Sequence, residues 1–357
     1  GTLFTLTADD NLMYDFAQWL AWYRAYGITT TLCAPTPNYY ESNDLWNQMV
    51  NSGLYVQSHS HFHRSTNDYK YTSTAQDWMD FYQGARDVEA TGIRSLIIAY
   101  PCGHNNSALS QLLYIGGRGT GGYANGFNVN YNETASFSGM NEAQFAKLLS
   151  RIEAGNGGWF STHYHQIGKS KDSIDSMLAR LVPYMQAGKL WSASFAAVCQ
   201  YGQERDTATL TMGNVGRDAI TFTLTDRMND LLFDQALTIK IKVDGTWRAA
   251  RAYQNGQEMP AKVVTEGGNT YLFVDAVPDR GEVTVVRTEL SGLTEGADRI
   301  AFTPVEAGDG YGNKVMTRRF FVTGDAWKNA YAVQGGQRIM AVVGNVGGDR
   351  YVDVTFD

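Results

Sequence analysis

The chain has 357 residues, of which 43% are hydrophobic and 18% are charged, and its formal net charge is −7. This length exceeds one ordinary hydrophobic core and predicts two or three domains, and the composition excludes a disordered chain. The acidic balance and the lack of a Lys/Arg-rich run argue against a nucleic-acid partner, and no stretch approaches the roughly 18 apolar residues of a membrane span.

Strand-like and helix-like runs alternate through the first 205 residues. Runs rich in Val, Ile, Leu, Thr or aromatic residues predict strands at 3–8, 28–34, 54–58, 94–100, 117–123, 159–163 and 190–195. Amphipathic runs between them predict helices at 15–26, 44–52, 75–91, 142–154 and 172–187. Repeated strand–helix units predict a parallel sheet covered by helices, and seven such units can close into a barrel. We therefore expect an α/β fold, a distorted (β/α)7 barrel, in residues 1–205.

The pattern changes after residue 205. Short alternating runs separated by Gly, Asp and Asn predict an antiparallel β-sandwich in residues 206–289, and residues 290–357 continue as a further β segment. The run 212–218 resembles the run 343–349, which predicts a repeated β unit. The second copy reaches the end of the chain, so we expect a partial second module. By fold-level analogy, this region is interpreted as a spacer or a glycan-positioning module.

Two adjacent carboxylates close the first predicted strand, in the run Thr7-Ala8-Asp9-Asp10. Side chains that leave a strand in succession point in different directions, so one carboxylate can bind a metal while the other faces a substrate. Taken alone, such a pair is more often a solvated turn.

Half of the six histidines lie within the run His59-Ser60-His61-Phe62-His63, which follows the third predicted strand. Histidines four residues apart share one face of a turn or helix and can chelate one ion. In an extended strand all three would lie on one side, and any two of them could bind a metal. A purely structural cluster is the alternative.

Two further motifs end predicted strands. The run 99–103, Ala-Tyr-Pro-Cys-Gly, ends a strand in a tight turn whose backbone N–H groups could face an oxyanion. The run 159–165, Trp-Phe-Ser-Thr-His-Tyr-His, delivers His163 and His165 to the same rim.

The order and spacing of these four motifs resemble the polysaccharide deacetylase family, also called carbohydrate esterase family 4, with its chitooligosaccharide deacetylase homology domain. The family pattern is Thr-x-Asp-Asp, His-Ser/Thr-x-x-His, a Pro-aromatic-Gly turn, and a hydrophobic strand that ends in His. The matching segments here are 7–10, 59–63, 101–103 and 160–163. The resemblance covers residues 1–205.

This resemblance implies metal-dependent hydrolysis of acetyl groups on an acetylated polysaccharide or oligosaccharide, with an N-acetylated amino-sugar glycan preferred. Asp10, His59 and His63 would hold one divalent ion and leave positions open for water and the acetyl carbonyl oxygen. The ion is expected to be Zn²⁺, although an Asp-His-His site also accepts Co²⁺ or Ni²⁺.

The resemblance also implies the proton-transfer roles. Asp9 would take a proton from the attacking water, and His163 would protonate the leaving amine or hydroxyl. The backbone N–H of Cys102 would hold the oxyanion. The other residues expected beside the oxyanion or the substrate are Tyr100, Pro101, Trp159 and Trp191, and further stacking candidates at the rim are Tyr39, Tyr40 and Tyr123.

The chain departs from the family pattern at several positions. The arginine that often precedes the turn proline by two residues, and pairs with the catalytic base, is replaced by Ala99. Cys102 replaces the aromatic residue of the turn, and Ser161 replaces an apolar residue of the acetate-methyl pocket, which Phe160 or Trp191 would fill instead. No counterpart of the family's Asp-Trp motif occurs in 116–137, so the group that tunes His163 stays open.

Other functions remain open from the sequence. The same site hydrolyses esters, so an O-acetyl esterase acting on acetylated xylan or another hemicellulose is one alternative. A catalytically inactive carbohydrate-binding protein and a structural adhesin are two more, and the complete motif set argues against inactivity. The substrate class implies a bacterial secreted, periplasmic or cell-surface location with an acetylated glycan as partner. The oligomeric state is not set by the sequence.

Overall fold

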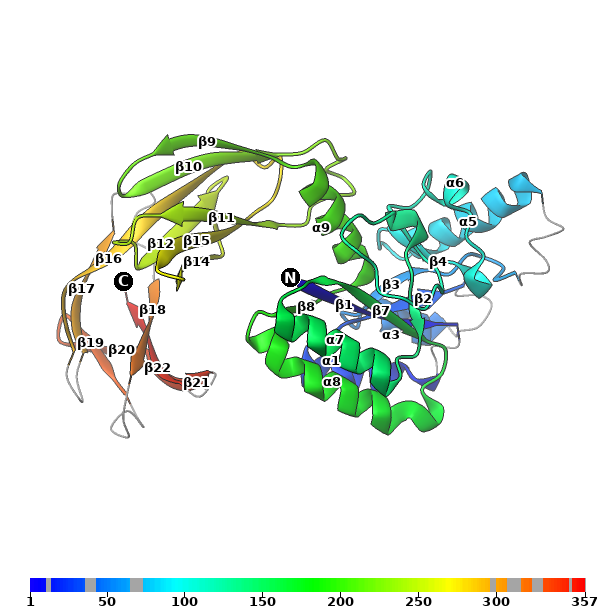
Figure 1. The fold of residues 1–357 in the computed structure, drawn as a ribbon, viewed down its shortest axis with the longest axis horizontal. Helices are drawn as coiled ribbons and strands as arrows, with labels where there is room; N and C mark the ends of the chain where they lie inside the picture. The colour runs from blue at the N-terminus through cyan, green and yellow to red at the C-terminus, as the bar shows by residue number, and fades with distance from the viewer. Residues whose placement is uncertain are drawn as a thin grey trace. The chain divides into compact units, whose positions relative to one another are not determined.

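The computed structural model describes residues 1–10, 14–35, 43–64, 73–295, 300–306, 316–322, 330–346 and 349–356. The chain divides into two compact units (Figure 1). The first comprises Gly1–Gln203 and Leu231–Phe233, and the second comprises Glu204–Asp230 and Asp234–Asp357. The three-part division at residues 205 and 289 stays a prediction. Among the described residues, no helix combines the length and apolar character needed to cross a membrane.

The first unit is built on one parallel sheet of eight strands. These are β1 Thr2–Asp9, β2 Thr30–Ala34, β3 Tyr55–Ser58, β4 Ile97–Ala99, β5 Gly116–Arg118, β6 Phe137–Ser138, β7 Gly158–Tyr164 and β8 Leu190–Ser192. The sheet order is β5-β4-β3-β2-β1-β7-β6, and β8 pairs with the first residues of β1. Thr134, just before β6, exchanges backbone hydrogen bonds with β5. The two ends of the sheet are therefore joined, which confirms the expected distorted β/α barrel.

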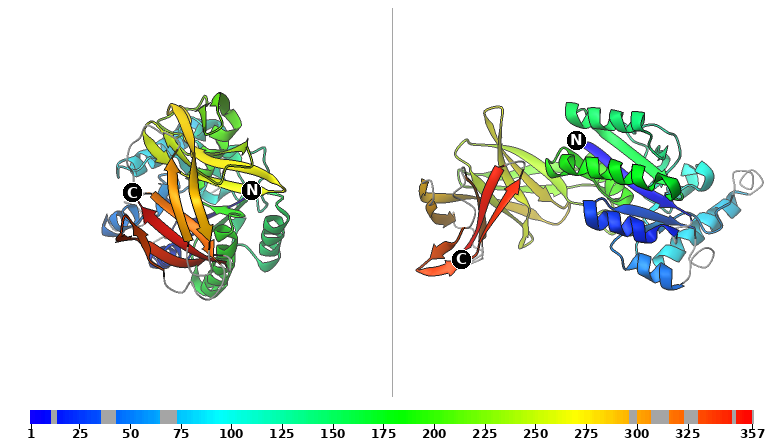
Figure 2. Two further views of the ribbon diagram at one scale, coloured as in Figure 1. Left: turned by 90° about the vertical axis from the view of Figure 1, so that its left-hand side faces the viewer. Right: turned by 90° about the horizontal axis from the view of Figure 1, so that it is seen from below.

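Helices lie outside the strands of this sheet, as Figure 2 shows from two directions. They are α1 Phe16–Tyr26, α3 Asn43–Val50, α5 Thr74–Glu89, α6 Ser107–Ser110, α7 Glu142–Ala154, α8 Lys171–Gln186 and α9 Phe195–Thr207, with short 3-10 turns η2 Pro101–Gly103, η3 Tyr131–Glu133 and η4 Gly168–Ser170. Capping boxes start α5 at Ser73 and α7 at Asn141. The sequence predictions missed α9, because its first turns are buried almost all round and lack a polar face.

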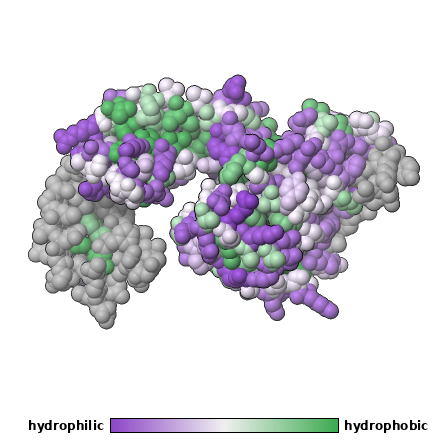
Figure 3. Space-filling model, in the orientation of Figure 1, coloured by the Kyte–Doolittle hydropathy of each residue, from purple (hydrophilic) through white to green (hydrophobic). Residues whose placement is uncertain are grey.

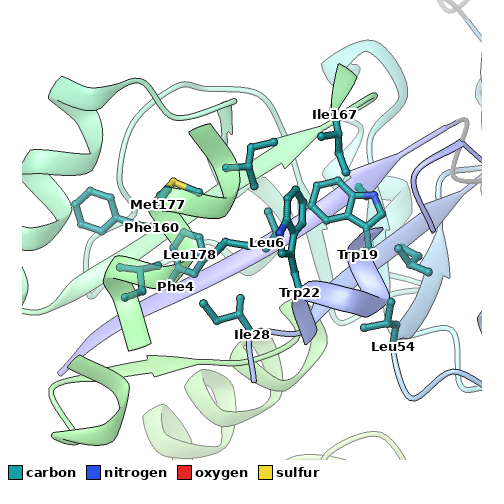
Figure 4. Packing of buried hydrophobic residues seen from close by; sticks show 14 of the residues in the cluster. Phe4, Leu6, Trp19, Trp22, Ile28, Leu54, Phe160, Ile167, Met177 and Leu178 are labelled. Carbon is teal, nitrogen blue, oxygen red and sulfur yellow. The ribbon is translucent and has the colours of Figure 1, made fainter. Parts of the chain in front are cut away.

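The strand β1 shows how the core positions the site. It is buried on both faces, as parallel strands covered by helices are. Phe4 and Leu6 pack outward into a cluster with Trp19 and Trp22 (Figure 4), and each such fully buried side chain contributes about 1.5–3 kcal/mol. The alternate residues of β1 point to the opposite face, so Asp9 enters the barrel interior.

The second unit consists of antiparallel sheets. Its strands are β9 Thr209–Val215, β10 Ala219–Thr225, β11 Leu237–Val243, β12 Ala249–Gln254, β13 Gln257–Met259, β14 Ala261–Glu266, β15 Asn269–Ala276, β16 Glu282–Glu295, β17 Ile300–Glu306, β18 Met316–Val322, β19 Ala332–Gln334, β20 Gln337–Ile339, β21 Ala341–Val346 and β22 Asp349–Phe356. The described sheets include the paths β13-β12-β16-β10-β9, β11-β15-β14 and β18-β22-β21.

A β repeat with a period of 80 residues runs through this unit. The pairings within β12–β15 recur, partner for partner, within β19–β22. Equivalent paired residues with the same identity are Ala252 and Ala332, Gln254 and Gln334, Gln257 and Gln337, Ala261 and Ala341, Val263 and Val343, Tyr271 and Tyr351, and Val274 and Val354. The run 343–349 therefore corresponds to 263–269, and not to 212–218 as the sequence comparison suggested. The match of 343–349 to 212–218 rests on Gly and Asn residues that recur in many short hairpins. The match to 263–269 rests on strand pairing that is the same over four strands.

Candidate active site

The first strand ends in two carboxylates that lie in different surroundings. Asp9 is 1% exposed, whereas the Asp10 side chain, just past the strand, is 18% exposed. Asp10 has a φ of 62°, a left-handed conformation that costs a residue with a Cβ about 1–2 kcal/mol. This turn of the backbone takes Asp10 out of the path of β1, so one carboxylate is closed off and the other lies at the rim.

The histidine turn after β3 is held in place by α5. The backbone N–H groups of His61 and Phe62 donate to Oδ1 of Asp80, at 2.9 and 2.7 Å, and Asp80 is fully buried. Gly84, one helical turn further along α5, lets the turn approach closely, because a Cβ there would lie 2.7 Å from the carbonyl carbon of Ser60. Sequence reasoning missed Asp80 and Gly84, which lie in a helix apart from the motif.

Asp10, His59 and His63 come together, and we call these three residues the metal side of the site. Nδ1 of His59 lies 2.7 Å from the carbonyl oxygen of Ala99. That oxygen can only accept, so Nδ1 carries the proton and Nε2 has a bare lone pair. Nε2 of His59 lies 3.2 Å from Oδ1 of Asp10, and Nε2 of His63 lies 2.9 Å from the same oxygen.

The donor set of the metal side fits a divalent ion. Within the described residues, neither Oδ1 of Asp10 nor Nε2 of His59 has a hydrogen-bond partner, although both atoms are buried. Two facing lone pairs away from water are unfavourable unless a cation joins them. One carboxylate oxygen and two imidazole nitrogens, all within 4.8 Å of one another, match the three protein ligands of an open Zn²⁺ site.

The charges on the metal side favour an ionised carboxylate. Burial raises the pKa of Asp10, but the neighbouring His59 and His63 outweigh burial and hold the pKa far below its usual value. Burial lowers the pKa of His63, but Asp10 outweighs that effect and the net shift is upward. A proton therefore competes with a metal for His63, and metal affinity should fall on acidification.

The two other rim histidines are placed differently. His61 turns to α5, where Nδ1 lies 2.6 Å from Oδ2 of Asp87. His165 is 56% exposed, and its Nε2 lies 3.6 Å from Oδ2 of Asp10. Of the arrangements left open by the sequence, the structure therefore selects the pair four residues apart, His59 and His63.

The buried partner of Asp9 is Arg118, at the end of β5. The guanidinium donates to Oδ2 of Asp9, and the two side chains are 1% and 2% exposed. Because β2, β3 and β4 separate β1 from β5 in the sheet, this ion pair spans the barrel interior. Arg118 lies opposite Ala99 in the pairing of β4 with β5. The guanidinium that residue 99 lacks is therefore supplied by the neighbouring strand.

The ion pair keeps Asp9 charged. Burial raises the pKa of Asp9, but Arg118, His59 and His163 outweigh burial and lower it below its usual value. Oδ1 of Asp9 has no hydrogen-bond partner among the described residues, so one carboxylate oxygen is available to accept a proton. Sequence reasoning missed Arg118. Its only local signal was a single cation in a Gly-rich run, which the sequence predicted as a strand over 117–123, whereas the observed strand β5 ends at Arg118.

His163 ends the inner face of β7 and is 1% exposed. Nδ1 lies 3.0 Å from Oγ of Ser136, which in turn lies 3.2 Å from Oγ of Ser161. Burial, and then the charge of Arg118, lower the pKa of His163 to about 3, although Asp9 acts in the opposite direction. The ring is therefore neutral at neutral pH. We call Asp9, Arg118 and His163 the proton side of the site.

The predicted turn lies beside these groups as η2. Cys102 is exposed and has a φ of 55°, and Pro101 is buried. Tyr100 does not face a substrate, because it is 1% exposed and its hydroxyl contacts Oγ of Ser110 and donates to the carbonyl of Asn132. The turn therefore exposes residue 102 and buries the aromatic ring before it.

Two predicted aromatic residues differ in placement. Trp159 is 2% exposed, donates to Oγ1 of Thr5 and packs 4.8 Å from the ring of Phe195. A ring enclosed in this way cannot stack on a sugar, which corrects the expectation for Trp159. Trp191 is half-buried with its ring 5.0 Å from that of Tyr201. Tyr39 and Tyr40 lie outside the described residues.

Phe160 is the other residue suggested for the acetyl-methyl pocket. It points outward from β7 and stacks on Phe137 with ring centroids 6.3 Å apart. It therefore lies on the face of the strand opposite His163, which corrects that suggestion.

Comparisons with known proteins find a family match in the N-terminal part of the chain. Residues 2–114 match the model of the family described as polysaccharide deacetylase. The chain is 28% identical over 326 residues to a gellan lyase from Bacillus sp., which covers 81% of this chain and 13% of that protein. This chain thus corresponds to a small part of the relative.

Two solved structures share low identity with the chain. The Xyl-CE4 domain of a multidomain xylanase from the hindgut metagenome of Trinervitermes trinervoides is 16% identical, with a TM-score of 0.37 over 54% of this chain and 87% of that one. A family 4 carbohydrate esterase from Streptomyces lividans is 16% identical, with a TM-score of 0.36 over 54% and 92%. Likenesses of this size carry no argument about activity. The family match covers residues 2–114, which include the Asp9-Asp10 pair and the histidine turn, so this part of the chain is similar to polysaccharide deacetylases.

Proposed function

We propose that the first unit removes acetyl groups from an acetylated polysaccharide by metal-dependent hydrolysis, with N-acetyl groups of an amino sugar preferred. One observation carries this proposal. Nε2 of His59 and Nε2 of His63 converge on Oδ1 of Asp10, and the preceding residue in the chain, Asp9, has an ionised carboxylate with one oxygen free. The family match supports deacetylation of a polysaccharide in general. The metal, the residue roles and the N-acetyl preference are the finer parts of the proposal.

The chemistry divides between the two sides. A divalent ion bound to the metal side would polarise the acetyl carbonyl and lower the pKa of water. Asp9 accepts the proton of the attacking water on Oδ1, because Arg118 holds Oδ2 and keeps the carboxylate ionised. The backbone N–H of Cys102 is proposed to donate to the developing oxyanion.

His163 delivers a proton to the leaving nitrogen or oxygen in this proposal. Its ring is neutral in the free chain, so it must take up a proton during the cycle. Ser136 holds Nδ1, which fixes the orientation of the ring. The neighbouring Asp9 carboxylate favours the charged ring and Arg118 disfavours it, so the two members of the ion pair set the balance.

The relative supports a polymeric substrate. It is named for cleaving gellan, and the match extends through 81% of this chain, so it includes part of the β-sheet unit. We propose that the second unit acts as a spacer or positions a glycan for the first.

Acetate release from a panel of glycans tests the function. The panel contains N-acetylated chitooligosaccharides, O-acetylated xylan and acetylated gellan, each incubated with and without a chelator. We expect release from the chitooligosaccharides that chelation stops and added Zn²⁺ restores. Release from xylan alone would show that the chain is an O-acetyl esterase and not an N-deacetylase. No release from any substrate by chain with metal bound would favour a carbohydrate-binding protein.

A further inference from the structure

A groove lies on the outer side of the first unit, between α7 and the segment 122–124. Its volume is about 470 Å³, within the range of about 300–1,000 Å³ that small-molecule sites occupy. The buried rings of Phe137 and Phe160 form its floor, and Tyr123, 58% exposed, stands at its edge. The segment is fixed to the barrel, because the backbone N–H of Gly122 donates to the carbonyl of Ser136 at 3.1 Å. The groove is thus part of the folded first unit.

The groove carries positive charge in an acidic chain. Lys147 and Arg151 both line it and lie four residues apart on α7, so their side chains share one face of the helix. None of the described residues that line the groove is acidic. The exposed side of α7 and α8 is mostly hydrophilic (Figure 3). Two cations so placed repel each other slightly, and a bound anion removes that repulsion.

The two cations are available to a ligand. Arg151 places one N–H 3.4 Å from the carbonyl of Gly157, which leaves most of its five donors for other partners. Lys147 has no carboxylate partner within the described part of the chain. A guanidinium and an ammonium near the exposed ring of Tyr123 suit a ligand that combines a carboxylate with a sugar ring, because the sugar stacks on Tyr123 and the carboxylate pairs with the cations.

We propose that this groove binds a glycan segment that bears carboxylates, a run of uronic acid residues. The inference rests on the proposed function only in that the bound glycan is the polysaccharide to be deacetylated. Phe137 and Phe160 point outward from β6 and β7, whereas His163 lies on the opposite face of β7. The groove is therefore separate from the proton side of the site, and it holds the polymer without touching the reacting groups.

Binding of tetragalacturonate to the full chain in chelator tests the proposal without depending on activity. The matched ligand is the same tetrasaccharide after reduction of its carboxyl groups. Titration calorimetry should give saturable binding of the acidic ligand, and binding of the reduced ligand weaker by roughly tenfold or more. The double variant Lys147→Gln/Arg151→Gln should lose the acidic ligand to a similar extent, and Tyr123→Ala should weaken both ligands.

A second double variant controls for net charge. Lys171→Gln/Lys189→Gln removes the same charge from exposed positions outside the groove and should leave the affinity unchanged. Equal weakening by both double variants, equal affinity for the two ligands, or no saturable binding at millimolar tetragalacturonate would overturn the proposal. Acetate release from a small acetylated substrate should be unchanged in Lys147→Gln/Arg151→Gln. The acetate-release assay therefore tests the deacetylase proposal, and the calorimetric titration tests the groove independently of it.

Discussion

The metal side and the proton side of the site lie at the same end of the barrel but are supported differently. The metal side is partly open to solvent, and its supports come from nearby parts of the fold: Asp80 and Gly84 of α5 hold the histidine turn, and the carbonyl of Ala99 sets the tautomer of His59. The proton side is fully buried, and its central contact, Asp9 with Arg118, joins residues 109 positions apart. In the proposed mechanism, the ligands of an exchangeable ion would therefore lie at an accessible rim, whereas the proton acceptor would be held by a fixed charge inside.

The largest effect should come from removing one ligand of the metal side. His59→Ala should abolish metal binding and reduce acetate release to background, because two ligands no longer hold an ion in an open site. Metal content and acetate release measured on the same sample check this. His61→Ala is the matched control, since His61 belongs to the same turn but contacts Asp87, and it should keep its metal. Loss of metal in both variants would contradict the assignment.

On the proton side, Asp9→Asn should separate turnover from metal binding. The amide cannot accept the proton of water, so acetate release should fall by about 10²- to 10⁴-fold while metal content stays at that of the wild type. Circular dichroism confirms that the variant is folded. Normal acetate release would remove Asp9 from the base role.

The ion pair inside the barrel should dominate the stability of the proton side. Arg118→Met leaves the carboxylate of Asp9 buried without its partner and should lower the free energy of unfolding by about 3–5 kcal/mol. The double variant Asp9→Asn/Arg118→Met removes both charges and should recover part of this loss. Denaturant unfolding of the two single variants and the double variant measures the coupling. Additive losses would mean that the two residues do not stabilise each other.

A smaller effect on metal binding is expected when the contact between Asp80 and the histidine turn is removed. Asp80→Ala removes the acceptor of two backbone N–H groups in that turn and should weaken metal affinity by about 10- to 100-fold. Asp87→Ala is the control, because Asp87 contacts His61 and neither metal-side histidine. Metal titrations followed by competition with a chromogenic chelator give both affinities. An unchanged affinity in Asp80→Ala would show that the turn holds its shape without α5.

The last expected effect is a change in the pH dependence of stability. His163 has a pKa of about 3 when folded, below the ordinary histidine value of 6.5, so the unfolded chain binds more protons between these values. The stability that a neutral buried His163 contributes is complete above pH 6.5 and is lost as pH falls toward 3. In chelator, the melting temperature of His163→Gln should therefore fall less than that of the wild type between pH 7 and pH 4. Parallel curves would refute the low pKa.

Sequence reasoning identified the residues of the site that belong to short motifs. Asp9, Asp10, His59, His63 and His163 each end or follow a strand, and the carboxyl ends of parallel strands meet at one edge of a barrel. The positions of these motifs at the ends of predicted strands were therefore sufficient to predict that the side chains lie close together. The alternation of strands and helices likewise predicted the barrel.

The remaining features depend on contacts between distant segments. Arg118 reaches Asp9 across the barrel, and Asp80 reaches the histidine turn from a helix, so neither has a local pattern that indicates its partner. The burial of Trp159 depends on which face of β7 looks inward. In the second unit, strand register shows the repeat of β12–β15 as β19–β22, because every pairing recurs 80 residues later. The sequence comparison had matched the run 343–349 to a different hairpin.

The most direct test of the account is a metal titration of the chelator-treated chain, with acetate release measured at each step on the substrate that gave the strongest release. The account predicts that release rises from background and stops rising at one equivalent of Zn²⁺ per chain. It also predicts that His59→Ala stays at background throughout. Full release by the metal-free chain, or restoration of release in His59→Ala by one equivalent, would contradict the central claim that the metal side holds the ion that drives the reaction.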